Sequence, residues 1–138
     1  MGLFKKLWEG EPATRDHNPS DLGLDPAAKD MVHVDVVGES AYQQQIKKVR
    51  DAVAEHQGQD PWFVVRFVAD PSNPHDANAV KVVAWGKTVG YLPKAAAKKA
   101  QPKLKQSGGQ QVGVAQLMGG TKDKPTYGVL AYAKKGTI

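Results

Sequence analysis

Hydrophobic and polar residues alternate along several short stretches of this chain, a pattern typical of half-buried β-strands. In the first stretch, Val32, Val34 and Val36 alternate with polar residues. Later stretches add the β-branched and aromatic residues that favour strands. The pattern predicts six short strands: residues 31–38, 62–68, 79–85, 88–92, 111–118 and 127–134.

The segments between these strands indicate how the strands connect. Residues 71–78 are rich in Pro, Asn and Asp, which is turn chemistry, and Gly86 and Lys87 form a tight connection. Residues 119–125 begin with two glycines and end with a proline. We therefore expect an antiparallel meander in the middle of the chain and a hairpin at its C-terminal end.

Helical periodicity appears in residues 42–57, where apolar residues recur at the spacing of one helix face. That face is formed by Tyr42, Ile46, Val49 and Val53. Ser40 is a candidate N-cap, because serine side chains accept hydrogen bonds from the first helical amides. Gly58 is expected to end the helix.

A second, shorter helix is expected over residues 94–99. Pro93 suits the first turn of a helix, and alanine and lysine, which dominate this stretch, favour helical structure. Pro102 is expected to disturb the helix soon afterwards, because a proline inside a helix loses a hydrogen bond and clashes with the preceding turn.

The N-terminal 30 residues differ in character from the rest of the chain. Residues 1–9 place apolar residues at helical spacing and predict a short amphipathic segment, whereas residues 10–29 carry prolines, glycines and acids without sustained periodicity. We expect residues 1–30 to be an amphipathic segment followed by an irregular linker, and residues 31–138 to be one domain.

The expected fold class is mainly β with two helices, a β-rich α+β domain. Six short strands suit a small six-stranded barrel of the OB-like type, because closing a sheet removes exposed strand edges. Barrels of this type frequently bind nucleic acids, although fold alone does not establish function.

The net positive charge of the chain indicates a polyanion as its partner. The 138 residues include 19 Lys and Arg and 14 Asp and Glu, which gives a net charge of +5. From Lys81 onward the sequence contains eleven lysines and a single acid, Asp123. Basic character of this kind attracts nucleic acid or anionic membrane. The absence of cysteine excludes disulfides and thiolate metal sites. With neither a membrane span nor a signal peptide evident, we expect a cytoplasmic protein.

Residues 73–80, Asn-Pro-His-Asp-Ala-Asn-Ala-Val, form the least ordinary stretch. Together with Val89-Gly90-Tyr91-Leu92 and the upstream stretch from Val36 to Tyr42, this sequence resembles the HIRAN domain family. The family pattern is an Asn-Pro-x-Asp-x-Asn-Ala-Val loop, an alternating strand and a Val-Gly-Tyr/His-Leu element. The resemblance covers roughly residues 32–104.

The resemblance implies an OB-like DNA-binding domain. In helicase-linked members the pocket takes the 3′ end of a single strand, with a carboxylate on the terminal hydroxyl. Asp76 matches that carboxylate, which accepts a hydrogen bond from a hydroxyl but repels a terminal phosphate. Alternatively, Asp76 caps the turn before Asn78, and both roles can hold.

Other candidate nucleic-acid-binding residues stand at or beside the positions of the family pattern: Ser40, Tyr42, His75, Asn78, Tyr91 and Lys94. Lys98 is a further candidate because of its charge alone. His75 stands at an aromatic position and can stack on a base, and Lys94 can neutralise a phosphate. Packing or solvation is the alternative for each residue. End-binding members carry a basic and an aromatic residue where this chain has Ser40 and Ala41, so part of that pocket is missing.

General affinity for nucleic acid can rest on dispersed basic residues: Arg66, Lys81, Lys87, Lys94, Lys98 and Lys99. No phosphate loop, serine elbow or metal-binding histidine pair is evident, so we expect no enzyme, cofactor or metal. The sequence predicts a single-stranded DNA-binding module acting in DNA repair, replication or remodelling, with a helicase or remodelling ATPase as possible partner. The alternative is a protein-interaction or accessory module without DNA binding.

Overall fold

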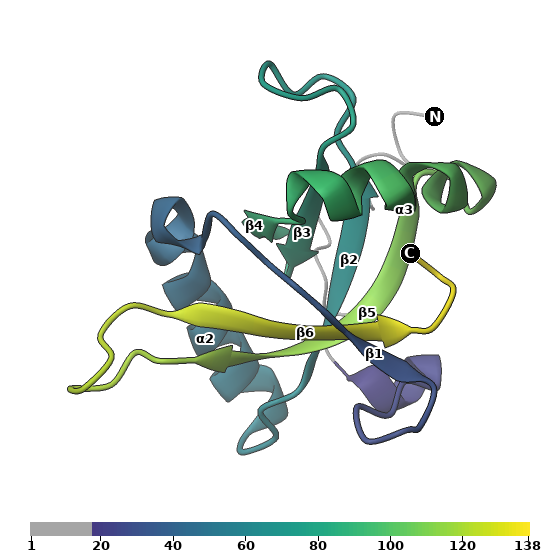
Figure 1. The fold of residues 1–138 in the computed structure, drawn as a ribbon. Helices are drawn as coiled ribbons and strands as arrows, with labels where there is room; N and C mark the ends of the chain where they lie inside the picture. The colour runs from purple at the N-terminus through teal and green to yellow at the C-terminus, as the bar shows by residue number, and fades with distance from the viewer. Residues whose placement is uncertain (1–17) are drawn as a thin grey trace, which may run out of the picture.

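A computed structural model describes residues 18–138 of the chain, so the expected amphipathic segment at residues 1–9 lies outside the described residues. One antiparallel sheet of six strands dominates these residues, in the order β1-β6-β5-β2-β3-β4 (Figure 1). The strands are β1 (Met31–Val34), β2 (Phe63–Ala69), β3 (Val80–Ala84), β4 (Lys87–Tyr91), β5 (Gln110–Met118) and β6 (Gly128–Lys134). The mainly β fold with two helices is confirmed.

The connections follow the pattern expected from the turns. Strands β2, β3 and β4 form the meander, with Phe67 paired to Val82, and β5 and β6 form the C-terminal hairpin. Strand β5 joins the sheet beside β2, and β1 pairs with the outer edge of β6. The two ends of the sheet are therefore β1 and β4.

The expected closed barrel is wrong, because β1 and β4 do not pair as strands. Within residues 18–138 a single isolated bridge joins the two ends, with reciprocal hydrogen bonds of 2.8 and 2.9 Å between the backbones of Val37 and Tyr91. The close approach needs Gly90, since a Cβ there would lie 2.6 Å from Cγ1 of Val36. The short β1 ends three residues before this bridge, which leaves the sheet open.

Helix α2 (Gln43–Gln57) buries Ile46, Val49 and Val53 as expected and ends before Gly58. The N-cap expectation for Ser40 is wrong. Ser40 lies inside a 3₁₀ turn, η2 (Glu39–Tyr42), which begins directly after Gly38 and leads into α2 without a side-chain cap. The side chain of the first helical residue, Gln43, bonds instead to the backbone of Tyr127, directly before β6.

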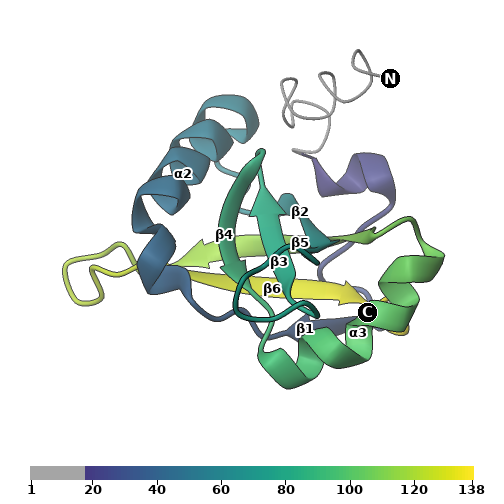
Figure 2. The same cartoon turned by 90° about the horizontal axis from the view of Figure 1, so that it is seen from above.

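Helix α3 (Lys94–Gln106) runs through Pro102, so the expected end before this proline is wrong. Its buried stripe consists of Ala97, Ala100 and Leu104, and Leu104 is fully buried. Burying a leucine contributes about 2 kcal/mol, which offsets much of the cost of the proline. Figure 2 shows α2 and α3 on opposite sides of the strands.

The core lies between the inner face of the sheet and the two helices. Its largest fully buried side chains include Phe63 and Phe67 of β2. Within the expected linker, a 3₁₀ turn, η1 (Pro19–Leu22), is capped by Asn18 and followed by the buried Leu24. No helix in the described part of the chain has the length and apolar character needed to cross a membrane.

Candidate nucleic-acid interface

The loop between β2 and β3, residues 70–79, is stabilised by hydrogen bonds from its own backbone to its own side chains. Oδ1 of Asn73 accepts hydrogen bonds from the backbone N–H groups of His75 (2.9 Å) and Asp76 (3.2 Å). Oδ1 of Asp76 accepts from the N–H of Asn78 at 2.9 Å. Asp76 therefore caps the turn with one carboxylate oxygen. Within residues 18–138 no hydrogen bond engages its Oδ2.

Residues from other elements hold the base of this loop. Oδ2 of Asp70 accepts a hydrogen bond from the Tyr91 hydroxyl of β4 at 3.1 Å and a longer one, 3.4 Å, from Nδ2 of Asn73. From α3, Nε2 of Gln101 donates to the carbonyl oxygen of Asn78 at 2.7 Å. The loop is thus tied to both β4 and α3, above which it rises in Figure 1.

Tyr42 and Tyr91, which are 49 residues apart in the sequence, meet beside this loop. Their ring centroids lie 6.1 Å apart with a tilt of 44°. Burial raises the pKa of Tyr91 to about 12, helped by the neighbouring Tyr42 hydroxyl and the Asp70 carboxylate. The Tyr91 hydroxyl is therefore a neutral donor to Asp70 across the physiological range.

Lys94 and Lys98 share one face of α3 with Gln101. Both are exposed, and with Gln101 they follow the i, i+4, i+7 spacing of one helix face. Gln101 bonds to the loop, so the two lysines share the helix face that contacts it. The structure thus gathers the loop, the tyrosine pair and two cationic side chains on one side of the molecule.

The remaining basic candidates are spread more widely. Lys81 lies opposite Tyr91 in the β3–β4 ladder, and Arg66 on β2 is paired to Val83 of β3. Lys87 begins β4, next to the turn that follows β3. Lys99 instead borders a groove between α3 and β1. The structure therefore separates Lys99 from the loop.

Ser40 and Tyr42 belong to the same 3₁₀ turn but border different features. Tyr42 contacts Tyr91, whereas Ser40 borders a pocket against the β5–β6 hairpin. Two polar residues that position the loop, Asp70 and Gln101, were absent from the sequence-based site. An acid directly after a strand and before a Pro-rich loop was the available signal for Asp70. Nothing local marks Gln101.

The fold and the site together indicate the class of protein. It is a small antiparallel β-domain in which a polar loop, capped by its own side chains, lies beside paired aromatic rings and a basic helix face. The family model described as the HIRAN domain matches residues 29–125, more than half of the chain. The chain belongs to the HIRAN family, as its motifs indicated. Comparison with curated proteins and with solved structures found no match.

HIRAN domains are in general DNA-binding modules and are not catalytic by themselves. Among residues 18–138, no three His, Asp or Glu side chains are grouped so that they could hold a metal ion.

Proposed function

We propose that this chain binds single-stranded nucleic acid, preferentially DNA, on the side formed by residues 70–79, the Tyr42–Tyr91 pair and the start of α3. The observation that carries the proposal is the hydrogen bond between Tyr91 and Asp70, which ties the aromatic pair to the loop. Aromatic rings beside cations are the usual means of holding a single strand, since bases stack and phosphates pair with lysines.

Asp76 is proposed to recognise a 3′-hydroxyl. Its Oδ1 is held by the N–H of Asn78, which orients the carboxylate, while Oδ2 remains available as an acceptor. A terminal hydroxyl can donate to this oxygen, whereas a terminal phosphate is repelled by it. Turn capping and end recognition are thus two uses of one carboxylate.

His75 and Asn78 flank Asp76 and are both exposed. An exposed imidazole can stack on the terminal base, and an exposed amide can bond to a base edge or the sugar. A module that holds 3′ ends fits a role in DNA repair, replication or remodelling, with a helicase or remodelling ATPase as partner.

The test compares fluorescent single strands that end in a 3′-hydroxyl, end in a 3′-phosphate, or are closed into a circle. Wild type is expected to bind the 3′-hydroxyl strand most tightly. Asp76→Asn keeps an oxygen that can cap Asn78 but removes the charge, so the variant is expected to lose most of the discrimination against the 3′-phosphate. Asp76→Ala removes both the cap and the acceptor.

Equal affinity of wild type for all three strands would sink end recognition and leave general strand binding. Failure to bind any oligonucleotide at low salt would favour the alternative, a protein-interaction or accessory module.

A further inference from the structure

Strand β1 stands at one end of the sheet and leaves one of its two edges open. Among residues 18–138 it pairs with β6 alone. The N–H of Lys135 donates to the carbonyl of Asp30 at 2.7 Å, and hydrogen-bonded and non-bonded pairs alternate along an antiparallel ladder. The main-chain N–H and C=O of His33 therefore point to the open edge, where an added strand can bond to both.

The groove between α3 and β1 runs along this edge and has a volume of about 240 Å³. The apolar part of its lining consists of Val32, Val34, Leu92, Ala96, Ala100 and Ile138. The two alanines of α3 leave room for side chains of an occupant, and Val32 is 40% exposed. Pockets for whole small ligands usually begin at about 300 Å³. This groove therefore suits the side chains of a partner whose backbone is bound beside it.

The helix wall of the groove is basic. Lys99 lines the groove, and Lys103 follows four residues later on the same face of α3. Both are exposed, and Nζ of Lys103 bonds to the main-chain oxygen of Ile138 at 3.2 Å. The one acid in the lining, Asp35, has its carboxylate 3.4 Å from Nδ1 of His33. An acidic residue within reach of Lys99 is therefore favoured in the occupant.

On the opposite face of the sheet, a row of aromatic rings leads to the same edge. The Tyr132 ring lies 5.9 Å from that of Trp62 and 5.7 Å from that of His33, its partner in the β1–β6 ladder. The His33 side chain is 51% exposed at the end of this row. Aromatic cross-strand neighbours stabilise sheets, so an added strand with an aromatic residue opposite His33 extends the row.

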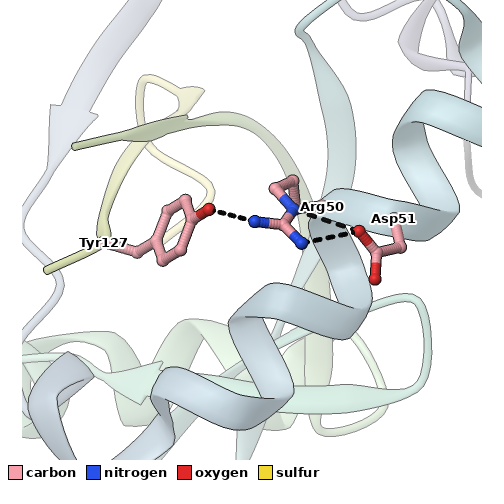
Figure 3. A network of polar contacts seen from close by, with 3 residues as sticks. All are labelled: Arg50, Asp51 and Tyr127. Carbon is pink, nitrogen blue, oxygen red and sulfur yellow. Dashed lines mark hydrogen bonds and ion pairs between the residues drawn. The ribbon is translucent and has the colours of Figure 1, made fainter. Parts of the chain in front are cut away.

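The strand that holds β1, β6, is anchored to α2. The hydroxyl of Tyr127, directly before β6, accepts a hydrogen bond from Arg50, which is itself bound by Asp51 at 2.9 and 3.0 Å (Figure 3). The chain beyond β1 is held where the backbone of Val37 bonds to Tyr91. The open edge is thus fixed at both ends, which lowers the entropic cost of binding a partner.

We propose that the open edge of β1 and the groove beside α3 bind an extended acidic segment of a partner protein as an added strand. An aromatic residue of the segment lies opposite His33, its apolar neighbours enter the groove, and an acid meets Lys99. In strand addition the main-chain bonds give affinity and the alternate side chains give specificity. The inference does not depend on the proposed function.

A second copy of this chain is the competing occupant. Antiparallel pairing of two β1 strands places both α3 helices on one face of the joined sheet, which brings their lysines together. Each copy also carries a net charge of +5. Because like charges oppose association, an acidic segment is the favoured occupant.

The probe is a fluorescent peptide with blocked ends, Glu-Thr-Val-Tyr-Val-Thr-Glu, whose affinity is measured by anisotropy. A peptide with lysines in place of both glutamates is expected to bind wild type about 5- to 10-fold more weakly. Lys99→Ala is expected to weaken binding of the acidic peptide about 3-fold and to narrow this difference. Lys105→Ala is the matched control, because Lys105 is exposed on α3 but does not line the groove, and it should change affinity less than about 2-fold.

The strand wall is tested by Val32→Asp, which places a charge in the groove and is expected to weaken binding about 10-fold. Val37→Asp is the matched control, since Val37 is 44% exposed but lies outside the groove. A wild type that sediments as a dimer, and that Val32→Asp converts to a monomer, would assign the groove to a second copy and overturn the inference.

N-methylated peptides test the main-chain bonds without altering the protein. A methyl group on the tyrosine amide blocks antiparallel addition, whereas one on the amide of the following valine blocks parallel addition. One of the two peptides is expected to lose about 10-fold in affinity and the other less than about 3-fold. Tolerance of both methyl groups, equal binding of the acidic and basic peptides, or no peptide binding by folded wild type would overturn the inference.

Discussion

Asp70 and Asp76 show how two carboxylates in one loop take different roles. Asp70 accepts hydrogen bonds from Tyr91 and Asn73 and secures the base of the loop, whereas Asp76 caps the turn and keeps one oxygen available. The cap at Asp76 was predictable, because an Asp bonds the amide two residues on. The bond between Asp70 and Tyr91 was not, because 21 residues separate them and only the sheet register brings them together.

Tyr91→Phe is expected to lower the free energy of unfolding by about 1 kcal/mol near neutral pH, since it deletes one part-buried hydrogen bond to a charged group. The effect depends on pH. The pKa of Tyr91 rises from 10.0 to about 12 on folding, mainly through burial. The stabilisation by Tyr91 is therefore fully present below pH 10 and is lost as the pH rises through about 12.

Chemical denaturation of wild type and Tyr91→Phe at a series of pH values measures this effect, because lysine deprotonation affects both proteins alike. The stability advantage of wild type should shrink between pH 10 and 12. A constant advantage across that range would contradict the assigned environment of the Tyr91 hydroxyl.

At the scale of elements, local periodicity predicted all six strands and the bounds of α2 within a few residues, because buried faces leave a direct trace in the sequence. It predicted the start of α3 but placed its end seven residues too early. The errors arose where distant contacts override local preference. Gly38 and the 3₁₀ turn displaced the expected cap at Ser40, and the buried Leu104 carried α3 through Pro102. The predicted closure of the barrel was wrong because closure depends on the length of β1 and on its distance from β4, and local sequence patterns encode neither.

Helix α3 provides a direct check of this balance. Pro102→Ala restores a backbone N–H and removes the ring from the helix interior, so it is expected to raise the free energy of unfolding by about 1 to 2 kcal/mol. Leu104→Ala, in contrast, is expected to lower it by about 2 to 5 kcal/mol. Thermal or urea denaturation measures both changes. A destabilised Pro102→Ala would show that the proline contributes packing that the helix requires.

At the scale of the whole molecule, the fold determines where the lysines of the basic C-terminal half lie. Lys94 and Lys98 share the face of α3 from which Gln101 bonds to the loop, whereas Lys124 borders the pocket at the β5–β6 hairpin. The sequence predicted that the C-terminal half is basic. It could not predict which lysines converge, because their positions depend on the packing of α3 and the hairpin against the sheet.

The central claim is that this basic side binds a single strand through its phosphates. The most direct measurement is the salt dependence of binding to a single-stranded oligonucleotide by wild type, Lys94→Ala and Lys98→Ala, with Lys99→Ala as a matched control on the other side of α3. We expect affinity to fall steeply with salt. Each of the two loop-side substitutions should weaken binding and lower the salt slope by about 0.7, while Lys99→Ala changes little. Absence of binding at low salt, or equal effects of all three substitutions, would contradict the claim.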